Sequence, residues 1–368
     1  MNNSTRYVAL DVFRGMTIAL MILVNNPGSW SHIYAPLEHS KWHGCTPTDL
    51  VFPFFLFIVG VSMFFSFAKY GSSLNKSSIG KILRRAALIF LIGLFLNSFP
   101  QWLTDYSKLR IMGVLQRIAL AYLFGSLIVL SSPKKWLPYI AAAIILIYWG
   151  LLYFLGGPDP YSLQGNFTTT FDSLILGKSH LYQGFGITFD PEGLFSTLPA
   201  IASVIIGYIV GEFISKTDKL KLPLYLLLIG LAGIIAGLLW GIILPINKPI
   251  WTSSYVIYTA GWACIIMAIL IWIIDIKGYS KWSSFFLVFG MNSLFIFALS
   301  GIWARILTKI IKINVHGTIV TGYNWLYINI FQPFAGDING SLLFAISHII
   351  VFWFICWVLY KNRIFIKV

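Results

Sequence analysis

Charged side chains are scarce in this sequence. Asp, Glu, Lys and Arg make up 10% of its 368 residues, whereas 58% are hydrophobic and the mean hydropathy is +0.81. Soluble domains carry roughly 25% charged residues. The shortage of charge therefore excludes a soluble globular protein and indicates a membrane protein.

Cysteine is also scarce, and the common catalytic motifs are absent. The three cysteines, Cys45, Cys264 and Cys356, are too few and too scattered for a disulfide framework or a metal cluster. The sequence contains no Walker A, HExxH, GxSxG or dinucleotide-binding motif. These absences argue against an ATP-driven pump and a zinc hydrolase, and we expect no metal cofactor.

Long apolar runs are abundant. They lack the two-residue alternation of barrel strands, and Asp11 and Arg14 near the start of the first run argue against a cleavable signal peptide. The sequence thus predicts an all-α, polytopic transmembrane helical bundle of about ten helices, with residues 1–368 forming a single domain. Each run is long enough to cross a hydrocarbon core of ~30 Å, and the ten lie at roughly 8–24, 50–68, 84–99, 111–130, 136–155, 195–214, 223–244, 254–274, 283–306 and 342–360.

The distribution of basic residues predicts the orientation of this bundle. With ten helices, sixteen of the 26 Lys and Arg residues fall on the side of the chain ends and seven on the other side, while Arg14, Arg117 and Arg305 lie within helices or at their edges. By the positive-inside rule, both termini then face the cytoplasm. The net charge of +14 is a topology signal that also attracts anionic lipids, and we expect no nucleic-acid partner.

Titratable residues concentrate in the predicted outer connection at 25–49. It holds three of the six histidines, His32, His39 and His43. A histidine suits proton transfer near neutral pH, because its unperturbed pKa is about 6.5. The spacing of His39 and His43 would also suit a metal on a helix, but the nearby prolines and glycine disfavour a long helix. On chemistry alone the three histidines remain equal candidates.

Charges within membrane helices are costly and are therefore candidates for function. Asp11 and Arg14 share a helix face and are placed to pair. Asp49 and Arg117 lie near the outer ends of their helices and are placed to meet across an outward cavity. Asn292 lies deep in the ninth predicted helix. The alternative for each is a structural contact between helices.

The other long outer connections, 156–194 and 307–341, are rich in aromatic residues, Gly and Asn and poor in charge. We expect them to form folded caps. The composition of 156–194 suits a carbohydrate-facing surface and equally a structural lid.

Motifs spread over nearly the whole chain resemble the heparan-α-glucosaminide N-acetyltransferase family. The family consists of transmembrane acyltransferases and includes the lysosomal enzyme and shorter bacterial relatives. The motifs are 10–16 (LDVFRGM), 24–25 (VN), 39–44 (HSKWHG), 49–53 (DLVFP), 113–117 (GVLQR), 190–193 (DPEG), 290–293 (GMNS) and 359–365 (LYKNRIF).

The resemblance implies a reaction and a set of site residues. The family uses cytosolic acetyl-CoA to acetylate a glucosamine amine across the membrane, and its active-site histidine falls on His39. The asparagine beside the acetyl group falls on Asn25. A homodimer is a further implication. The resemblance and the chemistry together give three catalytic candidates, His39, Asn25 and Asp49; five for acetyl-CoA, Arg14, Arg84, Arg85, Arg117 and Asn292; and three for the substrate, Trp42, His43 and Glu192.

We therefore expect a membrane acetyltransferase of amino sugars, in which His39 acts as the base or carries the acetyl group. It would lie in a bacterial inner membrane with its active-site loop on the outer side. Two alternatives remain open: an O-acyltransferase of envelope glycans, and a sugar transporter without acyl transfer. A transporter is disfavoured because the sequence has no matching pair of broken helices in its two halves.

Overall fold

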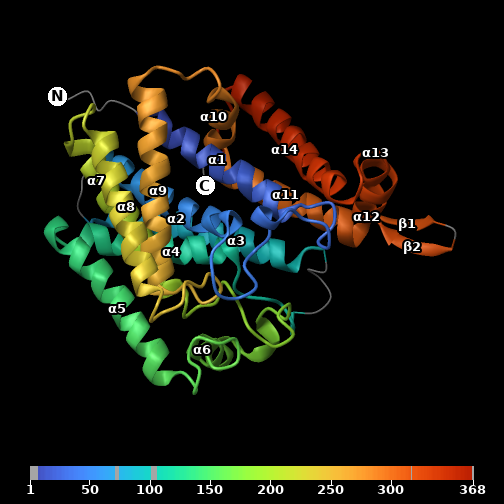
Figure 1. Cartoon of the computed structure of the whole chain (residues 1–368), viewed down its shortest axis with the longest axis horizontal. Helices are drawn as coiled ribbons and strands as arrows, with labels where there is room; N and C mark the ends of the chain where they lie inside the picture. The colour runs from blue at the N-terminus through green and yellow to red at the C-terminus, as the bar shows by residue number, and fades with distance from the viewer. Residues whose placement is uncertain (1–6, 71–73, 101–105, 316, 367–368) are drawn as a thin grey trace.

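The computed structural model of the protein describes residues 7–70, 74–100, 106–315 and 317–366, and these are predominantly helical (Figure 1). The helices are α1 (Val8–Asn25), α2 (Pro47–Tyr70), α3 (Lys76–Ser98), α4 (Val114–Ser131), α5 (Leu137–Leu155), α6 (Phe167–Leu176), α7 (Thr197–Lys216), α8 (Leu222–Trp240), α9 (Ser253–Leu270), α10 (Ser284–Met291), α11 (Ser293–Arg305), α12 (Gly322–Leu326), α13 (Gln332–Ala335) and α14 (Asp337–Lys361). Strands β1 (Lys312–Val315) and β2 (Thr318–Thr321) form an antiparallel hairpin.

Nine helices of the described residues are long and apolar enough to cross a membrane. The prediction of an all-α polytopic bundle is confirmed. The difference from the expected ten is α3, which is a continuous helix but is not among the nine. Its first half carries Lys81, Arg84 and Arg85, which interrupt the apolar character of the segment.

Helices α1 and α2 occupy the middle of the bundle. Helix α2 packs against α1 and α7, α9 pairs with α8, and α1 also contacts α10 and α14 (Figure 1). The backbone N–H groups of Val8 and Ala9 donate to Asp275, so α1 begins beside the end of the segment that continues α9. At the other end of α1, the N–H of Gly28 donates to the carbonyl of Ser341 at the start of α14. These two contacts place the start of α1 beside the end of the α9 segment and the end of α1 beside the start of α14, as expected for three helices that cross in alternating directions. Residues 1–6 and 367–368, at the termini predicted to be cytoplasmic, lie outside the described residues.

The predicted ninth helix, 283–306, is two helices. It breaks at Asn292, whose backbone leaves the helical region at φ −127° and ψ 36°. The Asn292 side chain donates to the carbonyl of Ile364 and accepts from the N–H of Ile366. The amide thus holds the C-terminal segment against the break between α10 and α11.

The three long outer connections are folded, as predicted. The first contains a short 3-10 turn at Ala35–Leu37, the second contains α6, and the third contains the β1–β2 hairpin with α12 and α13. In Figure 1 the hairpin extends from one edge of the bundle, whereas α6 lies near one end of α5. These caps bring residues distant in sequence to the outer end of the helices.

Two glycines allow α1 and α10 to cross at close range. A Cβ added to Gly15 would lie 1.7 Å from the carbonyl oxygen of Phe286, and one added to Gly290 would lie 2.3 Å from that of Asp11. Close crossings of this kind are a main source of helix association in membranes. The same segment of α1 carries the predicted ion pair, since Arg14 Nη1 lies 3.4 Å from Asp11 Oδ1.

We predict that Gly15→Ala destabilises the protein by about 1–3 kcal/mol, because the added methyl group forces the two backbones apart. Gly150→Ala in α5 is the matched control, since nothing lies within 4 Å of its added Cβ. The measurement is thermal unfolding in detergent, followed by the labelling of the buried cysteines Cys264 and Cys356 with a thiol-reactive dye. Equal melting temperatures for the two variants would contradict the close-crossing explanation.

Candidate active site

The start of α2 fixes a buried carboxylate. Thr46 precedes the helix, Pro47 is its first residue, and Asp49 lies in its first turn. Asp49 Oδ2 accepts hydrogen bonds from the backbone N–H and the hydroxyl of Thr46, both at 3.1 Å, and from the N–H of Ser40 at 3.0 Å. A carboxylate that reaches back to the residue before a helix closes one half of a capping box, and the helix dipole favours its negative charge.

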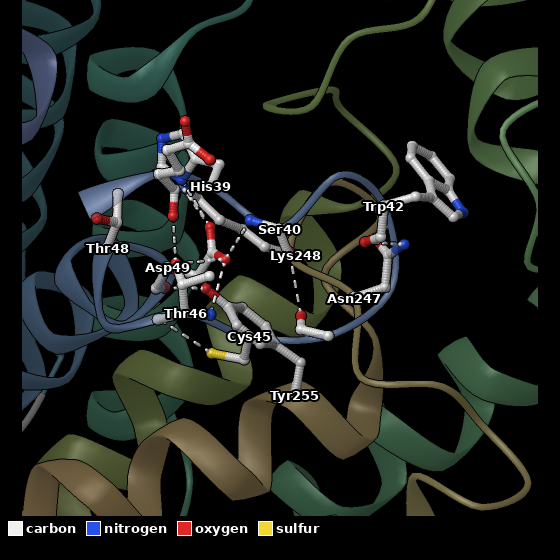
Figure 2. Close-up of polar contacts among 12 residues, drawn as sticks. His39, Ser40, Trp42, Cys45, Thr46, Thr48, Asp49, Asn247, Lys248 and Tyr255 are labelled. Atoms are coloured by element: carbon white, nitrogen blue, oxygen red, sulfur yellow. Dashed lines mark hydrogen bonds and ion pairs between the residues drawn. The ribbon is translucent and has the colours of Figure 1, made fainter. Parts of the chain in front are cut away.

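His39 binds the other oxygen of this carboxylate. Its Nδ1 lies 2.6 Å from Asp49 Oδ1 (Figure 2). An ionised carboxylate only accepts hydrogen bonds, so Nδ1 carries the proton of the neutral ring and Nε2 keeps its lone pair. The Asp49 side chain is 1% exposed, whereas that of His39 is 44% exposed. This is the arrangement in which a buried acid orients a histidine for proton transfer or nucleophilic attack.

Lys248 completes the cluster from the loop between α8 and α9. Its Nζ lies 3.4 Å from Asp49 Oδ1 and 3.1 Å from His39 Nδ1. Burial lowers the pKa of Lys248, while the charge of Asp49 opposes this change. Lys248 therefore lies beside the carboxylate oxygen that His39 also contacts.

These residues lie at the wall of a cavity of about 420 Å³, here called the His39 cavity. Glu192, Tyr182 and Phe185 of the second outer connection line it, together with Trp251. Carboxylates and aromatic faces in one cavity suit an amino sugar, because the ring can stack and the amine can be bound by charge-assisted hydrogen bonds. Among the described residues no group of three His, Cys, Asp or Glu side chains is arranged to hold a metal ion.

Arg110 holds the wall of the His39 cavity in place. It makes a two-pronged contact with Asp190, at 2.9 and 2.6 Å, and a further contact of 2.6 Å with Glu192. Burial disfavours its charge, but the two carboxylates outweigh burial and raise the pKa of Arg110. Its guanidinium also lies 4.7 Å from the centre of the Tyr182 ring.

Arg117 does not meet Asp49. Its Nη2 donates to the carbonyl of Gly193 and to the hydroxyl of Ser196, and its guanidinium lies 5.0 Å from the centre of the Trp251 ring. The predicted pairing of Asp49 with Arg117 therefore does not form, because Lys248 occupies the position beside the carboxylate. Arg117 lies behind the cavity wall, where it supports Trp251.

Trp42 and His43 are not among the residues that line the His39 cavity. Trp42 Nε1 donates to the carbonyl of Tyr161, and its ring packs edge-on against Phe185. Figure 2 shows Trp42 directed away from His39 and Asp49. His43 Nδ1 lies 3.4 Å from the side-chain nitrogen of Asn247. Of the three predicted substrate residues, only Glu192 lines the cavity.

Two further cavities lie along α1, α3, α4 and α11. The inner cavity, of about 240 Å³, is lined by Arg14 and Arg85. The middle cavity, of about 230 Å³, is lined by Asn25 and by Arg110, which also lines the His39 cavity. Arg14 and Arg85, both predicted to bind acetyl-CoA, thus line the inner cavity, and Asn25 lines the middle cavity.

Two other residues predicted to bind acetyl-CoA, Arg84 and Asn292, do not line the inner cavity. Arg84 is exposed on α3 and does not line the inner cavity, although Arg85 beside it does. Asn292 uses both polar atoms of its side chain to hold the C-terminal segment. Sequence reasoning missed Lys248 and Arg110. Lys248 had a signal, since it is the single charged residue between Lys221 and Asp275.

Comparisons with known proteins agree over most of the chain. The family model described as "Heparan-alpha-glucosaminide N-acetyltransferase, catalytic" matches residues 6–232. The mouse protein named heparan-alpha-glucosaminide N-acetyltransferase is 29% identical over 80% of this chain and 53% of its own length. The human protein of the same name is 28% identical over 79% of this chain and 52% of its own length. The chain thus spans about half the length of these curated relatives.

Asp172 in α6 gives a pH-dependent prediction. Its buried carboxylate accepts from the N–H of Phe195 at 2.9 Å, which fixes the turn that carries Glu192. Burial and the nearby Asp190 raise the pKa of Asp172 to about 7. Because the folded state holds this proton more tightly than the unfolded state, stability is lost as pH rises from about 4 to about 7.

We predict that Asp172→Asn removes part of this loss and melts about 5 °C above the wild type at pH 8, with little difference at pH 4. The amide keeps an oxygen that can accept from Phe195 without becoming charged. Melting temperatures of both proteins across this pH range are the measurement. Parallel curves for the two proteins would show that the Asp172 proton does not contribute.

Proposed function

The chain belongs to the heparan-α-glucosaminide N-acetyltransferase family, and on this basis we propose that it transfers an acetyl group across a membrane. The donor is acetyl-CoA on the cytoplasmic side, and the acceptor is the amine of a glucosamine-type sugar or glycan end on the outer side. The protein lies in a bacterial inner membrane, and residues 1–368 act as one acyltransferase domain. The names of the relatives support the reaction class. The order of the cavities supports the direction of transfer.

The observation that carries this proposal is the series of three cavities. The inner and middle cavities follow one another along α1, α3, α4 and α11, and the middle cavity shares Arg110 with the His39 cavity, which the start of α2 and the outer connections form. Lining residues of the inner and middle cavities are about one turn apart, for example Ile89 and Gly93 on α3. A thioester on a long arm can follow this series while the rest of CoA stays at the inner end.

The length of the arm fits the series. Arg14 in the inner cavity and Asn25 in the middle cavity are eleven residues apart on α1, or about 16 Å at the rise of a helix. The arm of CoA between the phosphate and the sulfur has thirteen bonds, which extend to roughly 16 Å at about 1.2 Å each. A phosphate held near Arg14 and Arg85 therefore places the thioester near Asn25.

The inner cavity suits the phosphate end of CoA. Arg14 and Arg85 line it, and Arg85 also lines a second hollow with Lys81. Guanidinium groups bind phosphates through paired, charge-assisted hydrogen bonds. Arg84, exposed beside them, contributes charge at the mouth rather than a direct contact.

His39 supplies the acid–base chemistry. The amine must lose a proton to attack the thioester carbonyl, and Nε2 of His39 accepts it; a carbon–nitrogen bond forms, the carbon–sulfur bond breaks, and the proton leaves with the CoA sulfur. In a two-step route, Nε2 attacks the thioester carbonyl and CoA leaves as its thiolate; the amine then attacks the acetyl-imidazole, the carbon–nitrogen bond to the ring breaks, and the proton that the amine loses ends on the CoA sulfur. Asp49 fixes the ring in either route, and Asn25 donates to the oxygen that becomes negative.

The acceptor lies in the His39 cavity. Glu192 binds its ammonium or hydroxyl groups, and Tyr182 and Phe185 offer faces on which the sugar ring stacks. Lys248 keeps the Asp49 carboxylate charged and fixed beside the ring. Trp42 acts indirectly, since it supports Phe185. The family also suggests a homodimer.

The proposal predicts the behaviour of three purified variants with acetyl-CoA and glucosamine. His39→Ala abolishes both CoA release and N-acetylglucosamine formation. Asp49→Asn lowers kcat at least a hundredfold, because the amide can no longer hold the Nδ1–H tautomer. His43→Ala, the matched control outside the cavity, keeps activity within a fewfold of the wild type.

Mass spectrometry of the sugar and a thiol assay for CoA are the measurements. Full activity in His39→Ala would move the chemistry to another histidine. O-acetylated sugar in place of the N-acetyl product would indicate an acyltransferase of hydroxyl groups. If the wild type releases no CoA with any amino sugar, the acetyltransferase proposal fails.

A further inference from the structure

Two buried polar groups in the middle cavity lack hydrogen-bond partners. Gln116 is 1% exposed and Asn26 is 3% exposed, and both line this cavity. Within the described residues, neither Nε2 of Gln116 nor Oδ1 of Asn26 has a partner. Nε2 of Gln116 is a hydrogen-bond donor, and Oδ1 of Asn26 is an acceptor. Buried polar groups are nearly always satisfied in native proteins, so this pair calls for a ligand.

The local structure holds both side chains in place. A Cβ added to Gly93 of α3 would lie 2.5 Å from Gln116 Oε1, and one added to Gly113 would lie 3.0 Å from it. The absence of a side chain at both glycines thus leaves room for the Gln116 amide. Asn26 donates through Nδ2 to the carbonyl of Ile22 at 2.8 Å, which fixes its amide with the oxygen left over.

The position of the pair points to the acyl donor. The middle cavity and the inner cavity are both lined by α1, α3, α4 and α11, and on α11 their lining residues follow one another within about one turn, as Leu294 and Phe297 illustrate. The middle cavity also shares Arg110 with the His39 cavity. The aromatic and acidic residues that suit a sugar line the His39 cavity instead. A secondary amide offers one acceptor and one donor, which matches the unsatisfied pair. The CoA arm carries such an amide two carbons from its sulfur.

We propose that the middle cavity binds this amide of the acyl donor. Gln116 Nε2 donates to the amide carbonyl, and Asn26 Oδ1 accepts from the amide N–H. This inference rests on the proposed function, since it assumes a donor with a pantetheine arm. By fixing the amide next to the thioester, the pair sets the depth at which the acetyl group stops beside Asn25. Gln116 and Asn26 thus bind the acyl donor, a role that the sequence motifs did not identify.

The test compares two ligands that share adenosine, its 3′-phosphate and the first 5′-phosphate. CoA carries the arm, whereas adenosine 3′,5′-bisphosphate lacks it. For Gln116→Met we expect the dissociation constant of CoA to rise about fivefold, as for a lost neutral hydrogen bond, while that of the bisphosphate stays within twofold of the wild type. Gln116→Leu also lacks the donor and should behave in the same way. The control is Gln164→Met, which changes an exposed glutamine in the second outer connection.

Each outcome is decisive when the measurements are made on detergent-purified, folded protein. An unchanged dissociation constant for CoA in both Gln116 variants would overturn the inference. An equal rise for both ligands would do the same, because it would show a structural effect at the inner cavity. A rise in KM for glucosamine alone would assign the cavity to the acceptor. If the wild type binds neither ligand, the proposed function itself fails.

Discussion

The Asp49 carboxylate is the interaction on which the candidate active site depends. It closes the start of α2, binds the N–H of Ser40, orients His39 through Nδ1 and pairs with Lys248. A single buried charge thereby joins the first outer connection, a membrane helix and the loop between α8 and α9. A buried carboxylate is tolerated only when its hydrogen bonds and charge are satisfied. The groups that satisfy Asp49 are therefore also the groups that position the histidine.

The helices around this site also form the cavities through which, in the proposed function, the acetyl group passes from one end of the bundle to the other. Close crossings at glycines such as Gly15 and Gly290 tie α1 to α10 on one side. On its other side α1 lines the inner and middle cavities together with α3, α4 and α11. The break at Asn292 lies next to the inner cavity, since Ser293 and Leu294 line that cavity. The distance along α1 from Arg14 to Asn25 therefore matches the length of the CoA arm.

Much of this architecture could be predicted from the sequence, because apolar runs and basic connections report directly on membrane helices. Comparison with a family supplied His39 and Asn25, which chemistry alone left open. The contacts between distant segments could not be predicted. Lys248 lies 209 residues from His39, and its role depends on how one loop folds over the start of α2. The failure of Asp49 and Arg117 to pair has the same origin, because hydropathy places both near one surface without giving their neighbours.

The most direct measurement of the central claim is acetyl transfer across a sealed membrane. Protein reconstituted in liposomes in a known orientation would be given acetyl-CoA on the side of α3 residues Lys81 and Arg85 and glucosamine on the side of His39. We predict that N-acetylglucosamine forms on the His39 side while CoA stays on the other side. Product that forms only when both substrates share one side would contradict a path through the three cavities.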